Sequence, residues 1–214
     1  MAIIIGMVSQ KGGVGKSTLA RMLAREYAAN NWRVKIADLD TSQGTATDWK
    51  KRRDQKGLEP DVAVESFRTV EQALKGQELY DMLIFDAPPH SMAGTLEIAR
   101  ASSLTVLPTG LSLDDLRPSV MLAHELVDKG ISAGDLVFVL CRVGDRLNEI
   151  EEARAYIERA GYECAAGSLP EKAGYRRASD DGRALSEVSF PTLRARAEDV
   201  AQSLIDSISK RLEG

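Results

Sequence analysis

A glycine-rich segment near the amino terminus carries the residue types that bind a nucleoside triphosphate. It runs from Gln10 to Thr18, between an apolar run and an amphipathic stretch. Glycine allows the dihedrals with which several backbone N–H groups can face a phosphate, and a following helix adds the positive end of its dipole. Lys16 would lie between the β- and γ-phosphates, the Ser17 hydroxyl would ligate Mg²⁺, and Thr18 would contact the α-phosphate. The segment predicts ATP and Mg²⁺ as cofactors; the alternative is a glycine-rich turn that merely precedes a helix.

Carboxylates stand at the ends of two other apolar runs. Asp38 and Asp40 are two residues apart, so in a strand both would face the same side, toward the Mg²⁺ of the loop. The alternative for this pair is a turn and helix-capping cluster, since Asp, Thr and Ser favour such sites. Asp86 ends the apolar run 82–86, and an acidic residue in that position beside a phosphate loop is the Walker B arrangement. Asp86 would hold Mg²⁺ through water.

The elements that must position these residues alternate along the chain. Apolar, β-rich runs predict strands at 3–9, 34–38, 62–66, 82–86, 104–108 and 136–141. Amphipathic stretches predict helices at 16–30, 45–53, 69–75, 113–129, 146–160 and 190–211. Several strands are continuously apolar, which is typical of a parallel sheet covered on both faces. The alternation predicts a single doubly wound α/β domain over 1–214, with the motifs at the carboxyl ends of the strands, where such folds bind ligands.

Composition limits the kinds of partner that the chain can have. The formal net charge is −4, so any contact with DNA must come from local clusters of Lys and Arg. Apolar residues make up 43% and charged residues 28%, a soluble globular balance. The longest apolar runs have the length of a strand, and we expect neither a signal peptide nor a membrane span. Cys141 and Cys164 form no CxxC pair, and the simplest interpretation is two buried free thiols in a cytoplasmic protein.

The start of the loop departs from the strict phosphate-loop pattern in two ways. Gln10 stands where that pattern has glycine, and Lys11 is an additional lysine. With these features the chain resembles the deviant Walker A family, the ParA-type partition ATPases and their relatives MinD and the nitrogenase iron protein. The resemblance implies a homodimer with ATP, in which Lys11 reaches the phosphates of the partner's nucleotide. The implied nucleotide contacts in the loop are Lys11, Gly12, Gly13, Val14, Gly15, Lys16, Ser17 and Thr18.

The resemblance also gives roles to the carboxylates. The family has an aspartate pair followed by Pro-Gln-Gly, and its second aspartate orients the attacking water, which implies this role for Asp40 and a supporting role for Asp38. Thr41-Ser42 stands where the family has a single proline, so the turn is one residue longer here. The implied catalytic residues are Lys11, Lys16 and Asp40, and the implied metal-binding residues are Ser17 and Asp86. A segment that senses the γ-phosphate in the family corresponds to residues 90–94.

Further contacts are implied by position alone. In the family the nucleotide base lies against residues after two later strands, and Arg142 and Pro170 hold those positions. Basic clusters stand at 50–53, 176–183, 194–196 and 210–211, and the simplest interpretation of each is a solvated helix face. The second cluster and the last helix resemble the family's DNA-facing surface, which binds phosphates without sequence preference. The implied DNA contacts are Arg176, Arg177, Arg194 and Arg196.

The last predicted helix bears on the choice between DNA and membrane. MinD-like relatives use an amphipathic helix at the carboxyl terminus to bind membranes. The apolar stripe here lacks Trp and Phe, and the charged face is mixed, which favours docking on the domain core over binding to a membrane.

Taken together, these features predict an ATP-hydrolysing switch for DNA segregation or cargo positioning in the cytoplasm, associated with the nucleoid. ATP would drive dimerisation, the dimer would bind nonspecific DNA, and a ParB-like or other partner would stimulate hydrolysis and release. Three alternatives stay open. They are a membrane-cycling ATPase of the MinD kind, an electron-transfer ATPase like the nitrogenase iron protein, which needs paired thiolates, and a non-hydrolysing adaptor in which the longer turn misaligns Asp40.

Overall fold

One parallel sheet lies at the centre of the molecule. The computed structural model describes residues 2–89 and 92–213. Within them the strand order is β3-β2-β4-β1-β5-β6-β7, with β8 paired to the end of β6, and neighbouring strands are parallel. The strands are β1 (Ile3–Met7), β2 (Val34–Asp38), β3 (Ala63–Ser66), β4 (Met82–Asp86), β5 (Leu104–Thr109), β6 (Leu136–Val143), β7 (Glu163–Cys164) and β8 (Leu169–Pro170).

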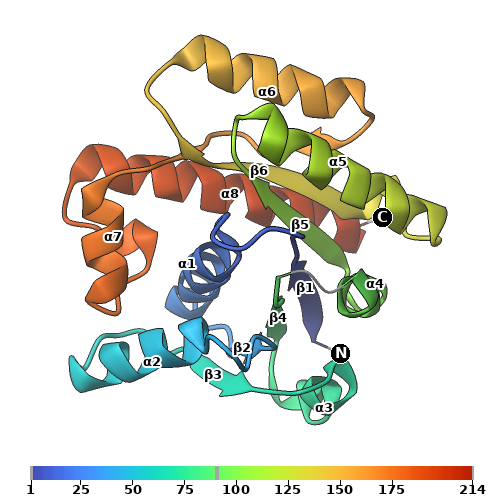
Figure 1. The fold of residues 1–214 in the computed structure, drawn as a ribbon. Coiled ribbons are helices and arrows are strands. Elements are labelled where there is room, and N and C mark those ends of the chain that lie inside the picture. Colours follow the sequence, from blue (N-terminus) through green and yellow to red (C-terminus); the bar gives the residue numbers. More distant parts are fainter. Residues whose placement is uncertain (1, 90–91, 214) are drawn as a thin grey trace.

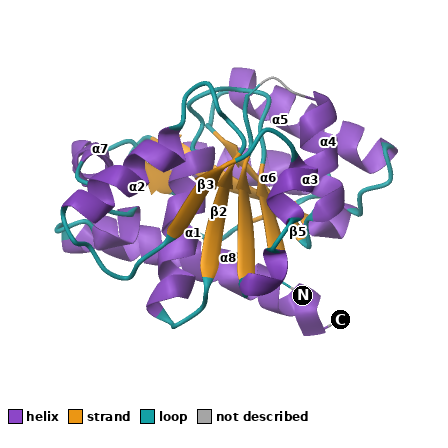
Figure 2. Ribbon diagram, turned by 90° about the horizontal axis from the view of Figure 1, so that it is seen from below, coloured by secondary structure: helices purple, strands orange, loops and turns teal. Residues whose placement is uncertain are grey.

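Helices cover both faces of this sheet (Figures 1 and 2). One layer holds α1 (Lys16–Ala29), α2 (Thr45–Gln55), α7 (Ala173–Asp180) and α8 (Pro191–Glu213). The other layer holds α3 (Val70–Leu74), α4 (Met92–Ala101), α5 (Leu113–Asp128) and α6 (Leu147–Arg159). Short 3₁₀ turns are η1 (Gln77–Leu79), η2 (Ala133–Asp135) and η3 (Leu185–Glu187).

The hydrophobic core is divided by the sheet into two halves. Along the first strand, Ile5 and Met7 pack with the layer of α1 and α8, whereas Ile4 and Val8 pack with the layer of α4 and α5. A strand that is buried on both faces needs apolar residues at every position, which explains its continuously apolar sequence. The predicted doubly wound parallel fold is therefore confirmed.

Two helices and two strands were not predicted. Each of the two helices contains a glycine, Gly94 in α4 and Gly174 in α7, a residue that is unfavourable inside a helix, and α7 is only eight residues long. The strands β7 and β8 are two residues long. The six predicted strands and the six predicted helices are present, with ends that differ by a few residues from the prediction.

The apolar stripe of α8 docks on the core, as predicted. Ala197, Val200, Leu204 and Ile208 are buried there, and Leu193 packs against them. The stripe is thus already covered by the domain itself. In the part of the chain that the structure describes, no helix is both long and apolar enough to cross a membrane.

The basic cluster at 50–53 is not simply a solvated face, because Arg53 is buried. Its side chain is 0% exposed, and its Nη1 lies 2.7 Å from Glu187 Oε2. It also donates to the carbonyl oxygens of Pro60 and Gly182. A Cβ on Gly182 would lie 2.5 Å from Arg53 N, so glycine is needed at this contact. Arg53 therefore links α2 to the segment between α7 and α8. The prediction that the cluster at 50–53 is a solvated helix face is wrong for Arg53.

Candidate nucleotide-binding site

The predicted phosphate loop joins β1 to α1 at the carboxyl edge of the sheet. Because β1 lies between β4 and β5, the loop is placed over the middle of that edge. Gly13 and Gly15 have φ angles of 72° and 121°, which residues with a side chain rarely adopt. A Cβ on Gly15 would also lie 3.2 Å from Cys141 Sγ. The path of the loop thus depends on glycine at both positions.

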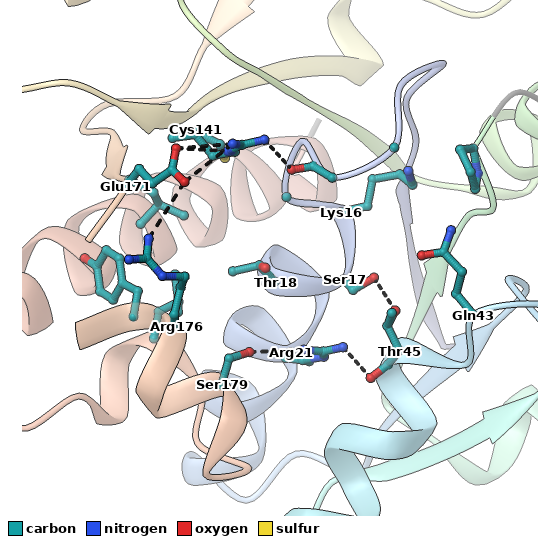
Figure 3. Close-up of a pocket in the computed structure, with 18 of the residues that line it drawn as sticks. Lys16, Ser17, Thr18, Arg21, Gln43, Thr45, Cys141, Glu171, Arg176 and Ser179 are labelled. Carbon is teal, nitrogen blue, oxygen red and sulfur yellow. Dashed lines mark hydrogen bonds and ion pairs between the residues drawn. The ribbon is translucent and has the colours of Figure 1, made fainter. Parts of the chain in front are cut away.

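A pocket of about 390 Å³ opens beside this loop, between it and the helices α2 and α7 (Figure 3). The predicted residues that line it are Gly12, Gly13, Gly15, Lys16, Ser17, Thr18, Asp40, Arg142 and Pro170, together with Arg176, which was predicted to contact DNA. The structure thus brings together the predicted phosphate contacts, the predicted water-orienting aspartate and the predicted base contacts. Lys11 and Val14 line an adjoining hollow instead.

Lys16 is a poorly solvated cation at the first turn of α1. Lys16 is 7% exposed, and its Nζ donates one long hydrogen bond, 3.3 Å, to the carbonyl oxygen of Lys11. Burial lowers the pKa of Lys16, while the charges of Asp86 and Asp40 act in the opposite direction. A desolvated ammonium group with one weak bond retains donors for the oxygens of a phosphate group.

Asp86 is a buried carboxylate for which the described residues provide no hydrogen-bond partner. It ends β4, is 1% exposed, and has no partner for either Oδ1 or Oδ2. Burial raises the pKa of Asp86 to about 6; the nearby Ser17 hydroxyl opposes this rise, and the charge of Asp38 adds to it. A buried carboxylate without a partner is costly, and a cation would compensate it.

These groups fit Mg²⁺. The ion prefers oxygen ligands and takes only one or two from the protein, with the rest from phosphates and water. Ser17 and Asp86 supply such oxygens next to the pocket. Among residues 2–89 and 92–213, no cluster of three or more His, Cys, Asp or Glu side chains could hold a metal by itself.

The two aspartates after β2 differ in what they bind. Asp38 is 0% exposed, and its Oδ2 accepts hydrogen bonds from the backbone N–H groups of Ala46 and Thr47 at 3.2 and 3.3 Å, at the start of α2. Asp38 therefore fixes the position of α2, the supporting role predicted for it. Asp40 Oδ1 accepts from the Ser42 hydroxyl at 2.6 Å and from the Gln43 N–H at 3.2 Å.

The longer turn thus makes contact with the predicted catalytic carboxylate. The Ser42 hydroxyl comes from the segment that replaces the single proline of the family, and it occupies one oxygen of Asp40. Asp40 nevertheless lines the pocket, beside Gln43. The capping interpretation thus accounts for Oδ1 of Asp40, which leaves Oδ2 for the predicted catalytic role.

Lys11 is held by an ion pair within its own chain. Its Nζ lies 2.8 Å from Asp115 Oδ1 in α5, and the Ser112 hydroxyl donates to Asp115 Oδ2 at 2.8 Å. The bond with Lys11 holds the pKa of Asp115 below its ordinary value. The side chains of this pair are 39% and 30% exposed. Lys11 therefore stays accessible, but it does not line the pocket of its own chain.

Arg142, in β6, and Pro170, in β8, both line the pocket. Arg142 has a φ of 55°, which is uncommon for a residue with a side chain. Its guanidinium donates to the carbonyl oxygen of Gly13 at 3.4 Å and pairs with Glu171 at 3.2 Å (Figure 3). The side chain is thus linked both to the phosphate loop and to the segment that leads into α7.

Arg21 and Thr45 are among the pocket residues that the sequence analysis did not identify. Arg21 follows Ser17 by one helical turn, a spacing that places both on the same face of α1 and could have revealed it. Its guanidinium donates to the Ser179 hydroxyl at 3.2 Å and to the carbonyl oxygen of Thr45. Burial lowers the pKa of Arg21 to about 10. Thr45, the first residue of α2, carries no comparable signal in the sequence.

The predicted DNA contacts lie on α7 and α8, two helices of the same layer. Arg176, Arg177 and Arg194 are exposed, and Arg196 is half-buried. The two helices touch through Tyr175, whose hydroxyl donates to the carbonyl oxygen of Leu193 at 2.5 Å. The arginines therefore stand on adjacent elements. Of the segment predicted to sense the γ-phosphate, His90 and Ser91 lie outside the described residues, and α4 begins at Met92.

Comparisons with known proteins place this geometry in a family. A family model described as the CobQ/CobB/MinD/ParA nucleotide binding domain matches residues 5–185. No curated protein sequence matches the chain. Solved structures do match it over nearly its whole length.

Three of these structures contain nucleotides. The septum site-determining protein MinD from Pyrococcus horikoshii, complexed with Mg-ADP, has a TM-score of 0.75 at 16% identity and covers 99% of each chain. A putative plasmid partition protein from Borrelia burgdorferi bound to AMPPNP has a TM-score of 0.73 at 17% identity, over 96% of this chain and 99% of that chain. A Cyanothece McdA(D38A)–ATP complex has a TM-score of 0.72 at 17% identity, over 95% and 96%. At such identities the similarity establishes the fold.

The family match itself extends over most of the molecule. It begins in β1, includes the glycine-rich loop and both strands that end in aspartate, and ends at Leu185, the first residue of η3. The chain belongs to the CobQ/CobB/MinD/ParA family of nucleotide-binding domains.

Proposed function

We propose that the chain is an ATP-hydrolysing positioning switch, in which ATP and Mg²⁺ bind in the pocket and cause two chains to form a dimer that binds DNA. The observation that carries the proposal is the pair of buried charges at the glycine-rich loop. Among the described residues, Lys16 is desolvated with one weak hydrogen bond, and Asp86 is buried with no hydrogen-bond partner. A magnesium triphosphate has the negative and positive charges that would satisfy both.

Each residue then has a role in hydrolysis. The loop N–H groups and Lys16 bind the phosphates, and Ser17 and Asp86 hold Mg²⁺, directly and through water. The ion, when bound, neutralises charge on the phosphate oxygens. Asp40 orients the attacking water through the carboxylate oxygen that does not bond to Ser42. Lys11 of one chain leaves Asp115 and reaches the phosphates of the other chain's nucleotide, which places a further cation where negative charge develops.

The experiment that tests this site is the Lys16→Ala variant. Loss of a charge-assisted contact with phosphate should weaken ATP binding by about 100-fold, on the scale of a few kcal/mol. Isothermal titration with a non-hydrolysable ATP analogue measures the change, and Lys75→Ala, which removes a lysine that is 75% exposed, is the matched control. Equal affinity of Lys16→Ala and the wild type would refute the assignment of the pocket.

The DNA-binding part of the proposal is supported by the exposed arginines of α7 and α8. The ATP-bound dimer should bind unrelated duplexes equally well, with a strong dependence on salt. Each neutralised phosphate contributes about −0.9 to the slope of log affinity against log salt concentration, and a dimer presents every residue twice. Replacing Arg177 by Ala should therefore flatten the slope by roughly two units. A sequence-specific complex that is insensitive to salt would contradict this part.

Release from DNA would follow hydrolysis, stimulated by a ParB-like or other adaptor. The proposal of a positioning role is supported by the plasmid partition protein among the structural relatives. A membrane cycle of the MinD kind is less well supported, because the apolar stripe of α8 is buried. An electron-transfer role is not supported either, since burial raises the pKa of Cys141 to about 12 and that of Cys164 to about 11, away from the thiolate form.

A non-hydrolysing adaptor is favoured by one observation, the bond between Ser42 and Asp40. Steady-state phosphate release, measured with and without DNA, separates it from the switch. Nucleotide binding and dimerisation without any turnover would establish the adaptor, whereas turnover that Asp40→Ala abolishes would establish the switch.

A further inference from the structure

Thr45 faces the group that is proposed to bind Mg²⁺. It is the first residue of α2 and lies in the wall of the pocket. Its Oγ1 lies 2.9 Å from the Oγ of Ser17, across the gap between α2 and α1 (Figure 3). Two hydroxyl groups from residues 28 positions apart in the chain thus meet at the wall of the pocket.

The backbone on both sides of this hydroxyl is fixed. The carbonyl oxygen of Thr45 accepts a hydrogen bond from the buried guanidinium of Arg21. The next two N–H groups, of Ala46 and Thr47, donate to the buried carboxylate of Asp38. Because these anchors come from the core side of α1 and β2, the position of the Thr45 hydroxyl is set by the fold itself.

The spacing of the two hydroxyls suits one metal ion. Mg²⁺ binds six oxygens in a near-ideal octahedron at about 2.0–2.1 Å, so that two adjacent ligands are about 2.9 Å apart. Ser17 Oγ and Thr45 Oγ1, which lie 2.9 Å apart in a hydrogen bond, are therefore close enough to bind the same ion. The buried carboxylate of Asp86, for which the described residues provide no hydrogen-bond partner, ends β4, the strand between β1 and β2.

We propose that the Thr45 hydroxyl is a second protein ligand of the Mg²⁺ that accompanies the nucleotide, in the coordination position next to Ser17. This inference rests on the proposed binding of a magnesium nucleotide in the pocket. It goes beyond that function because it ties α2 to the metal. The turn 41–44, which carries the Ser42 contact to Asp40, lies just before Thr45, so metal binding fixes the end of this turn.

The test compares Thr45→Val with Thr45→Ser. Valine keeps the shape of threonine without the hydroxyl, and serine keeps the hydroxyl. Fluorescence titration of the protein with a labelled ADP measures nucleotide affinity in EDTA, and Mg²⁺ is then titrated into the complex. Thr45→Val should weaken the apparent affinity for Mg²⁺ by about tenfold, the lower end of what a lost metal-site contact costs. Thr45→Ser should stay within about threefold, and nucleotide affinity in EDTA should be unchanged in both.

A second measurement reports on the ligand directly and does not involve activity. Mn²⁺ replaces Mg²⁺ in the ADP complex, and line broadening in ¹⁷O-enriched water counts the water molecules bound to the ion. Thr45→Val should hold one water more than the wild type, because water fills the lost position. Thr47→Val is the matched control, because Thr47 lies on the same helical turn as Thr45 and its hydroxyl bonds to Asp38 and Ser66.

The outcomes separate the two proposals. If the wild type fails to bind ADP, or binds it without any effect of Mg²⁺, the proposed function fails and the role of Thr45 fails with it. If the wild type binds Mg-ADP, but Thr45→Val has the same Mg²⁺ affinity and the same number of bound waters, only the role of Thr45 is overturned. An equal loss in Thr45→Val and Thr47→Val would also overturn it, because the cause would then be a loosened α2.

Discussion

Two buried charges of opposite sign characterise the candidate site at the scale of single residues. Burial lowers the pKa of Lys16 and raises that of Asp86, so each is shifted toward its neutral form. Such opposed shifts indicate groups that have lost water without gaining a full set of partners, which is common where a ligand supplies the missing charge. These shifts come from the fold around the loop, and the motif alone does not give them.

The pKa of Asp86 gives a prediction for stability in the absence of nucleotide. It is raised from 3.8 to about 6, so the folded protein binds this proton more tightly than the unfolded chain does. Ionising Asp86 therefore lowers the free energy of unfolding. This loss is absent below pH 3.8, grows between pH 3.8 and about 6, and is complete at higher pH, where it amounts to about 3 kcal/mol. Asp86→Asn should be more stable than the wild type at pH 8, and this advantage should vanish toward pH 4.

Urea unfolding followed by circular dichroism between pH 4 and 8 measures this difference. Asp81→Asn is a control of opposite sign, because hydrogen bonds from Arg33 lower the pKa of Asp81 to about 2. The ionised Asp81 carboxylate stabilises the folded protein above pH 3.8, the ordinary pKa of the group in the unfolded chain. Asp81→Asn should therefore lower the free energy of unfolding most at high pH and least in acid. A stability gain in Asp86→Asn that does not change with pH would mean that Asp86 ionises without penalty.

At the scale of elements, the turn between β2 and α2 positions the predicted catalytic carboxylate. Asp38 holds the start of α2, and Ser42 and Gln43 hold one oxygen of Asp40. We expect Asp40→Ala to keep ATP affinity within about threefold and to lose turnover, because the residue acts on water and not on the nucleotide. Phosphate release and equilibrium binding of an ATP analogue measure the two effects.

Asp48→Ala is the control for Asp40→Ala, since Asp48 is exposed on α2 and pairs only with Lys51 among the contacts described. It should retain both binding and turnover. Unchanged hydrolysis in Asp40→Ala would remove Asp40 from the mechanism. The longer turn would then have a structural role, with the capping interpretation sufficient for Asp40.

The buried ion pair between Arg53 and Glu187 joins two elements, α2 and η3. Their side chains are 0% and 8% exposed, and Arg53→Met would leave the carboxylate of Glu187 without its closest cation. Removing one partner of a buried pair costs about 3–5 kcal/mol, and because Arg25 Nε stays 3.5 Å from Glu187 Oε1 we expect a loss near the lower end of this range in the free energy of unfolding. Lys51→Met, at a neighbouring position that is 67% exposed, should change stability by less than about 0.5 kcal/mol. Similar unfolding curves for both variants would refute this.

At the scale of the whole molecule, the sequence predicts the sheet and the principal residues of the site for one physical reason. Strands buried on both faces are recognisable as apolar runs, and the carboxyl ends of parallel strands meet at one edge. The carboxylates at the ends of β2 and β4 could therefore be placed near the loop before the structure was known.

What the sequence does not predict depends on how distant segments pack. The link from Ser17 through Thr45 and Arg21 to Ser179 joins three helices, and its partners follow from the packing of α1, α2 and α7. The burial of Arg53 is hidden in a basic run that has the pattern of a solvated face. The ion pair of Lys11 with Asp115 spans 104 positions and contains no local signal.

This last ion pair bears on how the molecule would form a dimer. Two nucleotides that face each other across an interface repel, and a lysine from each chain placed against the other's phosphates cancels that repulsion. In the single chain Lys11 is bound to Asp115 at 2.8 Å. An exposed pair of this kind contributes at most about 1 kcal/mol, so the stronger charge of a partner's triphosphate can replace Asp115. Dimerisation would then depend on ATP.

Lys11→Ala is the variant that tests this exchange. It should keep ATP affinity through Lys16 but should neither dimerise nor bind DNA, and Lys11→Arg should not restore the dimer well, because a planar guanidinium differs from an ammonium group in shape and hydration. Asp115→Asn is the counterpart, and it should dimerise at least as well as the wild type, since Lys11 is then free from the start. Sedimentation velocity with a non-hydrolysable ATP analogue measures all three. A Lys11→Ala dimer as stable as that of the wild type would exclude a mechanism in which lysines cross the interface, and the nucleotide would have to control assembly through another surface.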